Sequence, residues 1–352
     1  MLMASLHRPL SLLLPLLLLI VLSEHLGLEA EARNLQNPTK LFVFGDSYVD
    51  TGNVGRDVGS SWKQPYGVTF PGKPAGRFSD GRVLSDFLAK YLGVRSPLPY
   101  RMRNLMPQYV KYGMNFAYGG TGVFNTAAHF PNMTVQIDFF QGLITDKVFA
   151  SADLDNSVAL VSVAGNDYSF YLATNGTAEG AQAFIASVVN QTLKNVARIH
   201  GLGVKKIAVS GLQPLGCLPQ TTASSSFSRC NSTFNSFATL HNTLLSQGLA
   251  KLKEEANDNS IVVVLDLYDS FMSVLNHPST HNIENHFKPC CVGVSSQYSC
   301  GSVDEKTMAK KYTVCDDPES AFFWDLVHPT QAGWRAVYNN LRATNALQQL
   351  QC

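Results

Sequence analysis

The stretch LFVFGDS at residues 41–47 decides the fold, because four apolar residues are followed at once by Gly, Asp and Ser. A short apolar run bounded by turn-forming residues is typical of a buried strand. Similar runs rich in β-branched residues follow at 158–163, 206–209 and 261–265. Apolar residues at three- and four-residue spacing predict helices between these runs, at 134–150, 178–200 and 234–255. This alternation predicts one α/β domain, with a mostly parallel central sheet between two layers of helices.

A candidate nucleophile stands just beyond the first predicted strand. In open parallel sheets, ligands bind beyond the carboxyl ends of the strands, and Ser47 lies at such an end. Gly45 permits a sharp backbone turn that would direct the Ser47 side chain into the cleft. Gly-Asp-Ser is also compatible with an ordinary strand-to-loop turn. The Gly-x-Ser-x-Gly sequence of the common α/β-hydrolase elbow is absent around Ser47.

A carboxylate and an imidazole lie three residues apart near the C-terminus, at Asp325 and His328. At this spacing the two side chains can meet on one side of a turn, where the carboxylate would hold the imidazole in one tautomer. The alternative is an Asp that caps the helix starting at Pro329, beside a structural His. A serine nucleophile needs a general base, and His328 is the His best placed to supply it.

Two further segments offer donors for an oxyanion. Asn166 follows the second strong strand, where its side-chain amide could face a developing negative charge, although an Asx turn would use the same residue. The glycines of segment 119–122 permit close approach of a backbone N–H, although a plain loop is the alternative. This segment lacks the full patterns of phosphate-binding and dinucleotide-binding loops.

In this order and spacing, these four segments resemble the sequence blocks of the plant GDSL-type esterase/lipase family, within the wider SGNH hydrolases. The resemblance runs from about residue 41 to residue 341 and includes the segments 76–82 and 214–217. It implies a flavodoxin-like three-layer α/β/α fold and a serine esterase that needs no metal or organic cofactor. It implies Ser47 as nucleophile, His328 as base and Asp325 as the group that orients it. The implied oxyanion donors are the Ser47 N–H, a glycine N–H (Gly119 in preference to Gly120) and the Asn166 side chain.

Two positions depart from that family's pattern. Tyr48 replaces the leucine that gives the family its name, and Tyr118 replaces the serine usual before the glycine pair. Neither change removes a catalytic group, but each can reshape the pocket or alter loop packing.

The family resemblance implies ester substrates broadly. A lumen-directed chain with several glycosylation sequons, and without a lid-like helix rich in aromatics, favours O-acetyl groups on cell-wall polysaccharide. Acyl lipids or small esters are the alternative within this class. A non-catalytic carbohydrate- or protein-binding relative is the alternative of another class.

The N-terminus predicts entry into the secretory pathway. Residues 1–32 combine His7 and Arg8, a leucine-rich run and a small-x-small sequence at 30–32, which is typical of a cleaved signal peptide. We expect residues 33–352 to form a single hydrolase domain, secreted to the cell wall, or held in the Golgi lumen by an uncleaved anchor. Four Asn-x-Ser/Thr sequons agree with this route: Asn132, Asn175, Asn190 and Asn231.

The charge argues against a nucleic-acid partner. Loss of residues 1–32 removes one Arg and three Glu, so the net charge rises from +1 to only +3. The apolar content of 45% excludes general disorder. No later stretch is apolar and long enough to predict a membrane span, and the sequence does not indicate an oligomeric state.

All seven cysteines follow residue 216, and in an oxidising lumen they predict disulfides. Cys217 and Cys230 form a natural local pair. Two further bridges of open connectivity are expected among Cys290, Cys291, Cys300 and Cys315, which leaves Cys352 over. A zinc site is the less favoured alternative, from His277, His281, His286, Cys290 and Cys291.

Overall fold

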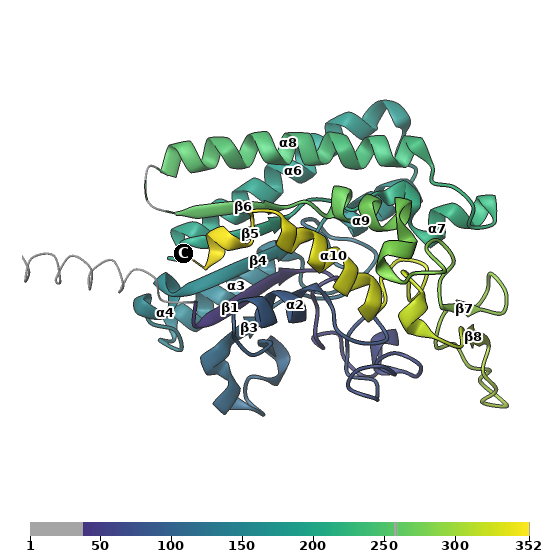
Figure 1. Cartoon of the computed structure of the whole chain (residues 1–352). Helices are drawn as coiled ribbons and strands as arrows, with labels where there is room; N and C mark the ends of the chain where they lie inside the picture. The colour runs from purple at the N-terminus through teal and green to yellow at the C-terminus, as the bar shows by residue number, and fades with distance from the viewer. Residues whose placement is uncertain (1–37, 257, 259, 352) are drawn as a thin grey trace, which may run out of the picture.

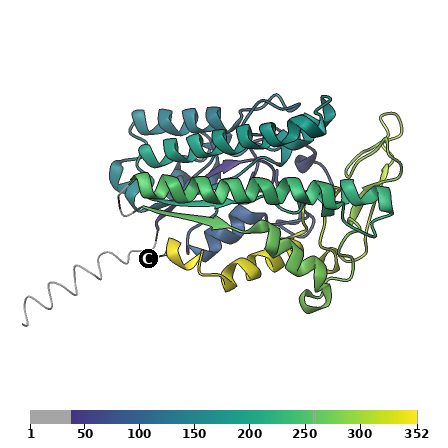
Figure 2. The ribbon, with the colours of Figure 1, turned by 90° about the horizontal axis from the view of Figure 1, so that it is seen from above.

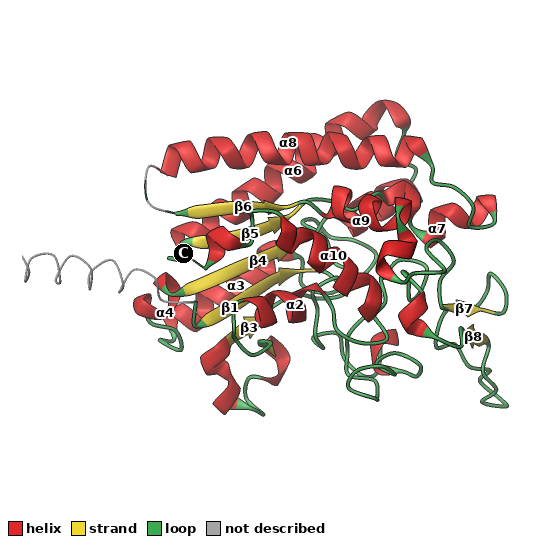
Figure 3. Ribbon diagram, in the orientation of Figure 1, coloured by secondary structure: helices red, strands yellow, loops and turns green. Residues whose placement is uncertain are grey.

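The computed structural model describes residues 38–256, 258 and 260–351. Its centre is a six-stranded parallel sheet in the order β2-β3-β1-β4-β5-β6, and Figure 3 labels β3, β1, β4, β5 and β6 of this sheet. The predicted signal peptide and Cys352 lie outside the described residues. The four predicted strands are present, and two short ones, β2 and β3, complete the sheet beyond β1. The strands are β1 Lys40–Gly45, β2 Leu98–Pro99, β3 Gly113–Asn115, β4 Ser157–Ser162, β5 Lys206–Ser210 and β6 Ile261–Leu265.

Alternate side chains of β1 enter two separate apolar cores, as the two-residue period of a strand requires. Leu41 and Val43 pack in the core beneath one layer of helices: α2 Leu84–Tyr91, α9 Leu267–Asn276 and α10 Gln331–Ala343. Phe42 and Phe44 pack in the core beneath the other layer: α3 Met133–Thr145, α6 Ala178–Gly201 and α8 Ser232–Ala256. The predicted three-layer α/β/α fold is confirmed.

The two helical layers are seen in Figures 1 and 2. In Figure 2, α3, α6 and α8 lie side by side, and α2 and α10 lie on the opposite side of the sheet. The predicted helix at 134–150 ends at Thr145, and a separate short helix follows it. The short helices are α4 Ser151–Asp155, α5 Gly165–Ala173 and α7 Pro219–Thr222. Among the described helices, none is both long enough and apolar enough to cross a bilayer.

Short 3-10 turns complete the connections. They are η1 Ser60–Trp62, η2 Tyr100–Met102, η3 Pro107–Tyr112, η4 Leu215–Cys217, η5 Ala223–Ser225, η6 Pro278–His281, η7 Pro318–Ser320 and η8 Gln348–Leu350.

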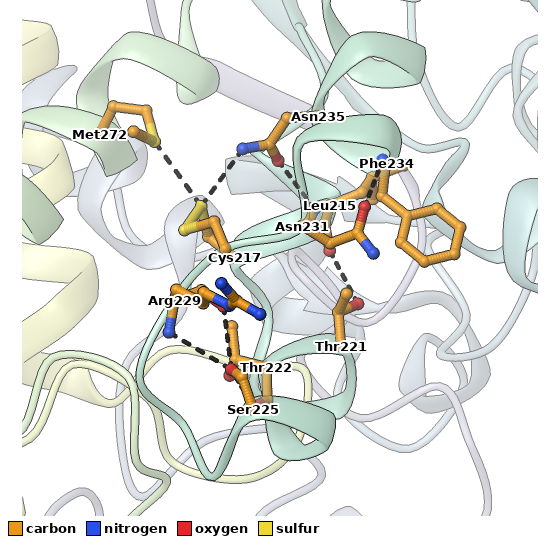
Figure 4. Close-up of a disulfide and its surroundings, with 12 residues drawn as sticks. Leu215, Cys217, Thr221, Thr222, Ser225, Arg229, Asn231, Phe234, Asn235 and Met272 are labelled. Carbon is orange, nitrogen blue, oxygen red and sulfur yellow. Dashed lines mark hydrogen bonds between the residues drawn. A yellow bond between two sulfur atoms is a disulfide. The ribbon is translucent and has the colours of Figure 1, made fainter.

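Three disulfides stabilise the loops at one end of the molecule. The predicted Cys217–Cys230 bridge is present, and Cys217 lies between Asn235 of α8 and Met272 of α9 (Figure 4). The open connectivity resolves as Cys290–Cys315 and Cys291–Cys300. These two bridges flank an antiparallel pair, β7 Cys291–Gly293 and β8 Tyr312–Val314. Because Cys290 and Cys291 are both oxidised, neither is available as a thiolate ligand for zinc.

The end of β1 has no room for a side chain at Gly45. Gly45 pairs in register with Ser162 of β4, and its φ is +144°. A Cβ atom at this position would lie 1.9 Å from the Ser162 carbonyl oxygen. The Gly45 N–H donates to the Gln136 side chain at 2.8 Å. Gly45 is the last residue of β1, so the two strands approach closely two residues before Ser47.

We therefore expect Gly45→Ala to lose at least about 3 kcal/mol of unfolding free energy, because it adds both a clash and a strained φ. Denaturant titration measures the loss. The matched control is Gly142→Ala in α3, where an added Cβ meets nothing within 4 Å. This control should gain about 0.5–1 kcal/mol from helix propensity. Equal stability of Gly45→Ala and the wild type would contradict the close approach.

Candidate active site

Ser47, His328 and Asp325 lie in one hydrogen-bonded row. Ser47 Oγ is 2.8 Å from His328 Nε2. His328 Nδ1 is 2.8 Å from Asp325 Oδ1 and 2.9 Å from Oδ2. The structure thus brings together the three residues that the sequence analysis proposed from positions as far as 281 residues apart.

A tight turn before α10 holds the Asp and the His. The N–H groups of Val327 and His328 both donate to Asp325 Oδ1 at 2.9 Å. The Trp324 N–H donates to the His328 carbonyl at 2.7 Å, which closes the turn. Thr330 then caps α10 by accepting from the Gly333 N–H. Asp325 therefore supports the turn and contacts the imidazole, whereas the cap of α10 is Thr330, so the alternative that Asp325 caps this helix is wrong.

Asp325 is buried, yet its pKa lies below the ordinary value of an aspartate. Burial alone would raise its pKa, but the charge of His328 and the hydrogen bonds from His328 and from the turn hold the pKa below its ordinary value. A carboxylate that stays ionised can stabilise an imidazolium. One further hydrogen bond reaches it, from the hydroxyl of Tyr66 to Oδ2 at 2.8 Å. The sequence gives no signal for this contact, because Tyr66 lies 259 residues away on a loop.

The candidate oxyanion donors differ in whether they already have hydrogen-bond partners. Asn166 stands in the first turn of α5, a helix that the sequence analysis did not predict. Its Nδ2 donates to the Thr121 carbonyl at 3.0 Å and, more weakly, to Asp46 Oδ2 at 3.4 Å. Within the described chain, the Ser47 N–H has no hydrogen-bond partner. That N–H is thus available to an incoming oxyanion.

The hydrogen bonding does not support the preference for Gly119 over Gly120. The Gly119 N–H donates to the buried Asp50 Oδ2 at 3.0 Å, so this donor is already used. Gly120 is half-buried with φ +83°, and among the described residues its N–H has no partner. Of the two glycines, Gly120 is therefore the one with a free N–H.

Three buried carboxylates lie in the segments that carry Ser47 and Asn166. Asp50 accepts from the N–H groups of Gly52, Asn53 and Gly119, and Asp167 accepts from those of Val123 and Phe124. Burial raises the pKa of each to about 6, although these donors oppose the shift. The sequence analysis missed both residues. Their position beside Ser47 and Asn166 in the sequence was the only available signal.

Asp46 is the third buried carboxylate, directly before Ser47. Its Oδ1 accepts from the Tyr48 N–H at 3.0 Å. Burial raises the pKa of Asp46 to about 7, although the Tyr48 N–H and the charge of His328 oppose this. The folded protein therefore holds protons at neutral pH that the unfolded chain releases.

This proton uptake predicts a pH dependence of stability. Each raised pKa lies above the unfolded value of 3.8, so these groups add stability as the pH falls from about 8 toward 4. We expect the melting temperature to rise as the pH is lowered from 8 to 6. Asp46→Asn should flatten this slope, because an amide does not titrate. The exposed Asp57→Asn is the control and should keep the wild-type slope. A melting temperature that falls as the pH is lowered from 8 to 6 would contradict the raised pKa values of these three carboxyl groups.

The two tyrosines that depart from the family pattern have different surroundings. Tyr48 is buried, its ring lies edge-on to Trp334 with centroids 5.0 Å apart, and its hydroxyl donates to the Val327 carbonyl at 3.0 Å. It thus joins the serine loop to the Asp–His turn. Tyr118 is half-buried and stacks on Phe130, and burial raises its pKa to about 12.

A cavity of about 200 Å³ opens beside Ser47. Its lining contains polar and apolar residues from the ends of β4 and β5 and from the segments that follow them. Among these are Ser162, Val163, Asn166, Leu212, Gln213 and Leu218. The ring of Phe78 lies 5.2 Å from the His328 imidazole, centroid to centroid, and does not line this cavity. The serine is therefore reached through a small, half-polar space.

A parallel α/β/α sheet that carries a serine, a histidine and an aspartate in this row has the arrangement of a serine hydrolase. The chain matches the family model of GDSL-like Lipase/Acylhydrolase over residues 41–341. A GDSL esterase/lipase of Arabidopsis thaliana is 58% identical over 311 residues, which cover 87% of this chain and 86% of that protein. A second from the same plant is 49% identical over 342 residues, covering 94% and 96%.

The chain therefore belongs to the GDSL-like lipase/acylhydrolase family, and it is an ester hydrolase of the esterase/lipase type. A solved acetyl xylan esterase from Geobacillus stearothermophilus matches 90% of this chain and 95% of its own, at 15% identity and a TM-score of 0.34. That similarity is too low to bear on this protein's substrate.

Proposed function

We propose that this protein is a secretory-pathway serine carboxylic ester hydrolase in which Ser47, His328 and Asp325 form a catalytic triad. The observation that carries the proposal is the unbroken row from Ser47 Oγ through both ring nitrogens of His328 to the buried Asp325. A serine hydroxyl is a weak nucleophile without an adjacent base. The row supplies that base and holds it in the tautomer that accepts a proton at Nε2.

The proposed reaction proceeds through an acyl-enzyme. His328 Nε2 takes the Ser47 proton as Oγ attacks the ester carbonyl, and it then gives that proton to the departing alcohol. Water repeats the sequence, so the acid is released and the Ser47 hydroxyl is restored. The scheme moves protons only between side chains, substrate and water, and it uses no metal or organic cofactor.

The tetrahedral oxyanion would be held by the N–H groups of Ser47 and Gly120 and by the Asn166 amide, which would exchange its long 3.4 Å bond to Asp46 Oδ2 for the oxyanion. Gly120 takes the place first assigned to Gly119, because the Gly119 N–H is bonded to Asp50. Donors fixed before the reaction need no reorganisation as charge develops, and each is worth about 10²–10³ in rate.

Ser47→Ala and His328→Ala should each reduce kcat on p-nitrophenyl acetate by about 10⁴-fold or more, and the double variant should lose no more than either one. Residues that act as a unit give such non-additive losses. Unchanged melting temperatures would show that the variants are folded, and EDTA should leave turnover unchanged. A Ser47→Ala protein with full activity would sink the proposal.

For the substrate, we propose short acyl groups, with O-acetyl groups on polysaccharide as the preferred class. The supporting observation is the cavity beside Ser47, whose volume of about 200 Å³ is below the range of about 300–1,000 Å³ common for sites of drug-sized ligands. Acetyl and similar groups fit this space, whereas a fatty acyl chain would have to extend beyond it. Acyl lipids remain the alternative class.

A series of p-nitrophenyl esters tests this preference. We expect kcat/KM to be highest at two to four acyl carbons and to fall by at least about tenfold by eight carbons, because longer chains outgrow the cavity. Acetate release from acetylated xylan, measured beside the series, tests the polymer. An optimum at long chains would replace the acetyl proposal with a lipase. No hydrolysis of any ester would favour a non-catalytic binding protein.

Residence in the secretory pathway is supported by three disulfides, which persist in oxidising compartments. Among the four sequons, Asn175, Asn190 and Asn231 are exposed, as glycosylation requires. Asn132 is half-buried, and its amide donates to Asn125 at 2.8 Å. We therefore propose glycans at the first three sites.

A further inference from the structure

The contact between Tyr66 and Asp325 has no part in the reaction as described so far. Tyr66 is only 4% exposed, and its hydroxyl donates to Asp325 Oδ2 at 2.8 Å. Its ring lies edge-on to Trp324, the residue before Asp325, with centroids 6.0 Å apart. Burial, together with the negative charge of Asp325, raises the pKa of Tyr66 well above its ordinary value. The phenol therefore stays protonated and acts as a donor.

The hydroxyl completes the hydrogen bonding of the carboxylate. Oδ1 accepts from the Val327 and His328 N–H groups and lies close to His328 Nδ1. Oδ2 faces His328 Nδ1 and Tyr66. In the described part of the chain, every other donor to Asp325 comes from its own turn, so Tyr66 alone connects this carboxylate to a distant segment. Without the hydroxyl, one buried oxygen would keep a single partner.

Two disulfides build the surroundings of Tyr66. The disulfide cluster, as we name it, is a small apolar core separate from the two cores of the sheet. Its buried members are Tyr66, Cys290, Cys291, Cys300, Tyr312, Ala321 and Trp324. The N–H groups of Cys290 and Cys291 donate to the Phe323 and Trp324 carbonyls at 2.9 and 2.6 Å. The same cluster therefore holds both the donor and the backbone that precedes its acceptor.

We propose that Tyr66 is a positioning residue for catalysis, which fixes the Asp325 carboxylate against His328 and withdraws part of its charge from the imidazole. The inference rests on the proposed triad. Tyr66 does not line the cavity beside Ser47, so it acts through Asp325 and not on the substrate. A hydrogen bond to an ionised group is roughly twice as strong as one between neutral groups, and this one is shielded from water.

Removal of the hydroxyl has two consequences. Asp325 loses a partner that fixes its orientation, which slows every step that uses His328 as base or acid. The carboxylate charge is then shared with fewer donors, so it stabilises the imidazolium of His328 more strongly. The other titratable groups facing this pair are Tyr48, behind the serine loop, and Asp46, on the Ser47 side. Neither contacts Asp325 Oδ2, and neither is changed by the substitution.

The test is Tyr66→Phe in the full-length protein with p-nitrophenyl acetate. We expect kcat to fall about tenfold, the loss of one hydrogen bond to a charged group, with KM changed less than twofold. The acid limb of the kcat/KM profile should move to higher pH. Tyr312→Phe removes a hydroxyl from the same disulfide cluster without touching Asp325, and it should keep the wild-type profile.

A double-mutant cycle separates positioning from general loosening. Asp325→Asn should reduce kcat strongly by itself, and Tyr66→Phe should cost nothing further in that background, because its acceptor has been altered. Additive losses would overturn the inference, as would a Tyr66→Phe protein with wild-type kcat and pH profile. Full activity of Ser47→Ala would instead reject the triad itself, so the two failures are distinguishable.

If Tyr66→Phe does not fold, a measurement on the wild-type protein still tests the hydrogen bond between Tyr66 and Asp325. A hydroxyl buried on a carboxylate exchanges slowly with water, so ¹H NMR should resolve the Tyr66 hydroxyl proton with a nuclear Overhauser effect to the His328 Nδ1 proton. A Tyr66 hydroxyl in rapid exchange with water would overturn the proposal.

Discussion

The parallel pairing of β1 with β4 is the constraint on which the rest of the site depends. Gly45 stands opposite Ser162 in this pairing, so Ser47 and Asn166 leave the sheet at the same edge, two and four residues later. The glycine-rich loop follows β3, which lies on the other side of β1. Three loops from adjacent strands therefore meet at one point, as expected for the carboxyl edge of a parallel sheet. His328 arrives from outside the sheet, on the turn before α10.

Buried aspartates hold these loops together at a cost in solvation. Asp50 bonds to a backbone N–H 69 residues away, and Asp167 bonds to N–H groups 43 and 44 residues away. Neutral donors only partly offset the loss of water, and the pKa of each group stays raised. Asp325 faces the ionisable His328 instead, and its pKa is lowered. A buried aspartate therefore has a raised pKa where its partners are backbone N–H groups alone, and a lowered pKa where it faces a histidine.

The sequence predicted the regular elements well where their apolar residues recur with the period of a strand or a helix. The long strands and the helices α6 and α8 carry clear periodicities, and the sequence-based bounds differ from the structure by at most two residues. Strands β2 and β3 have only two and three residues, too few to show a period. The choice between Gly119 and Gly120 as the proposed oxyanion donor depends on Asp50, and the proposed role of Tyr66 depends on a contact across 259 residues. No local pattern displays such contacts, and the Cys290–Cys315 pairing was open for the same reason.

The separation of Ser47 and His328 along the chain also bears on how this protein is made. Synthesis proceeds from the N-terminus, so the serine emerges long before the histidine 281 residues later. The pairing partners of β1 come later too, and α10 comes last of the main helices. A growing chain therefore carries Ser47 before His328, its proposed base, has been made. With the proposed triad, this order of the elements delays activity until the turn before α10 has been made.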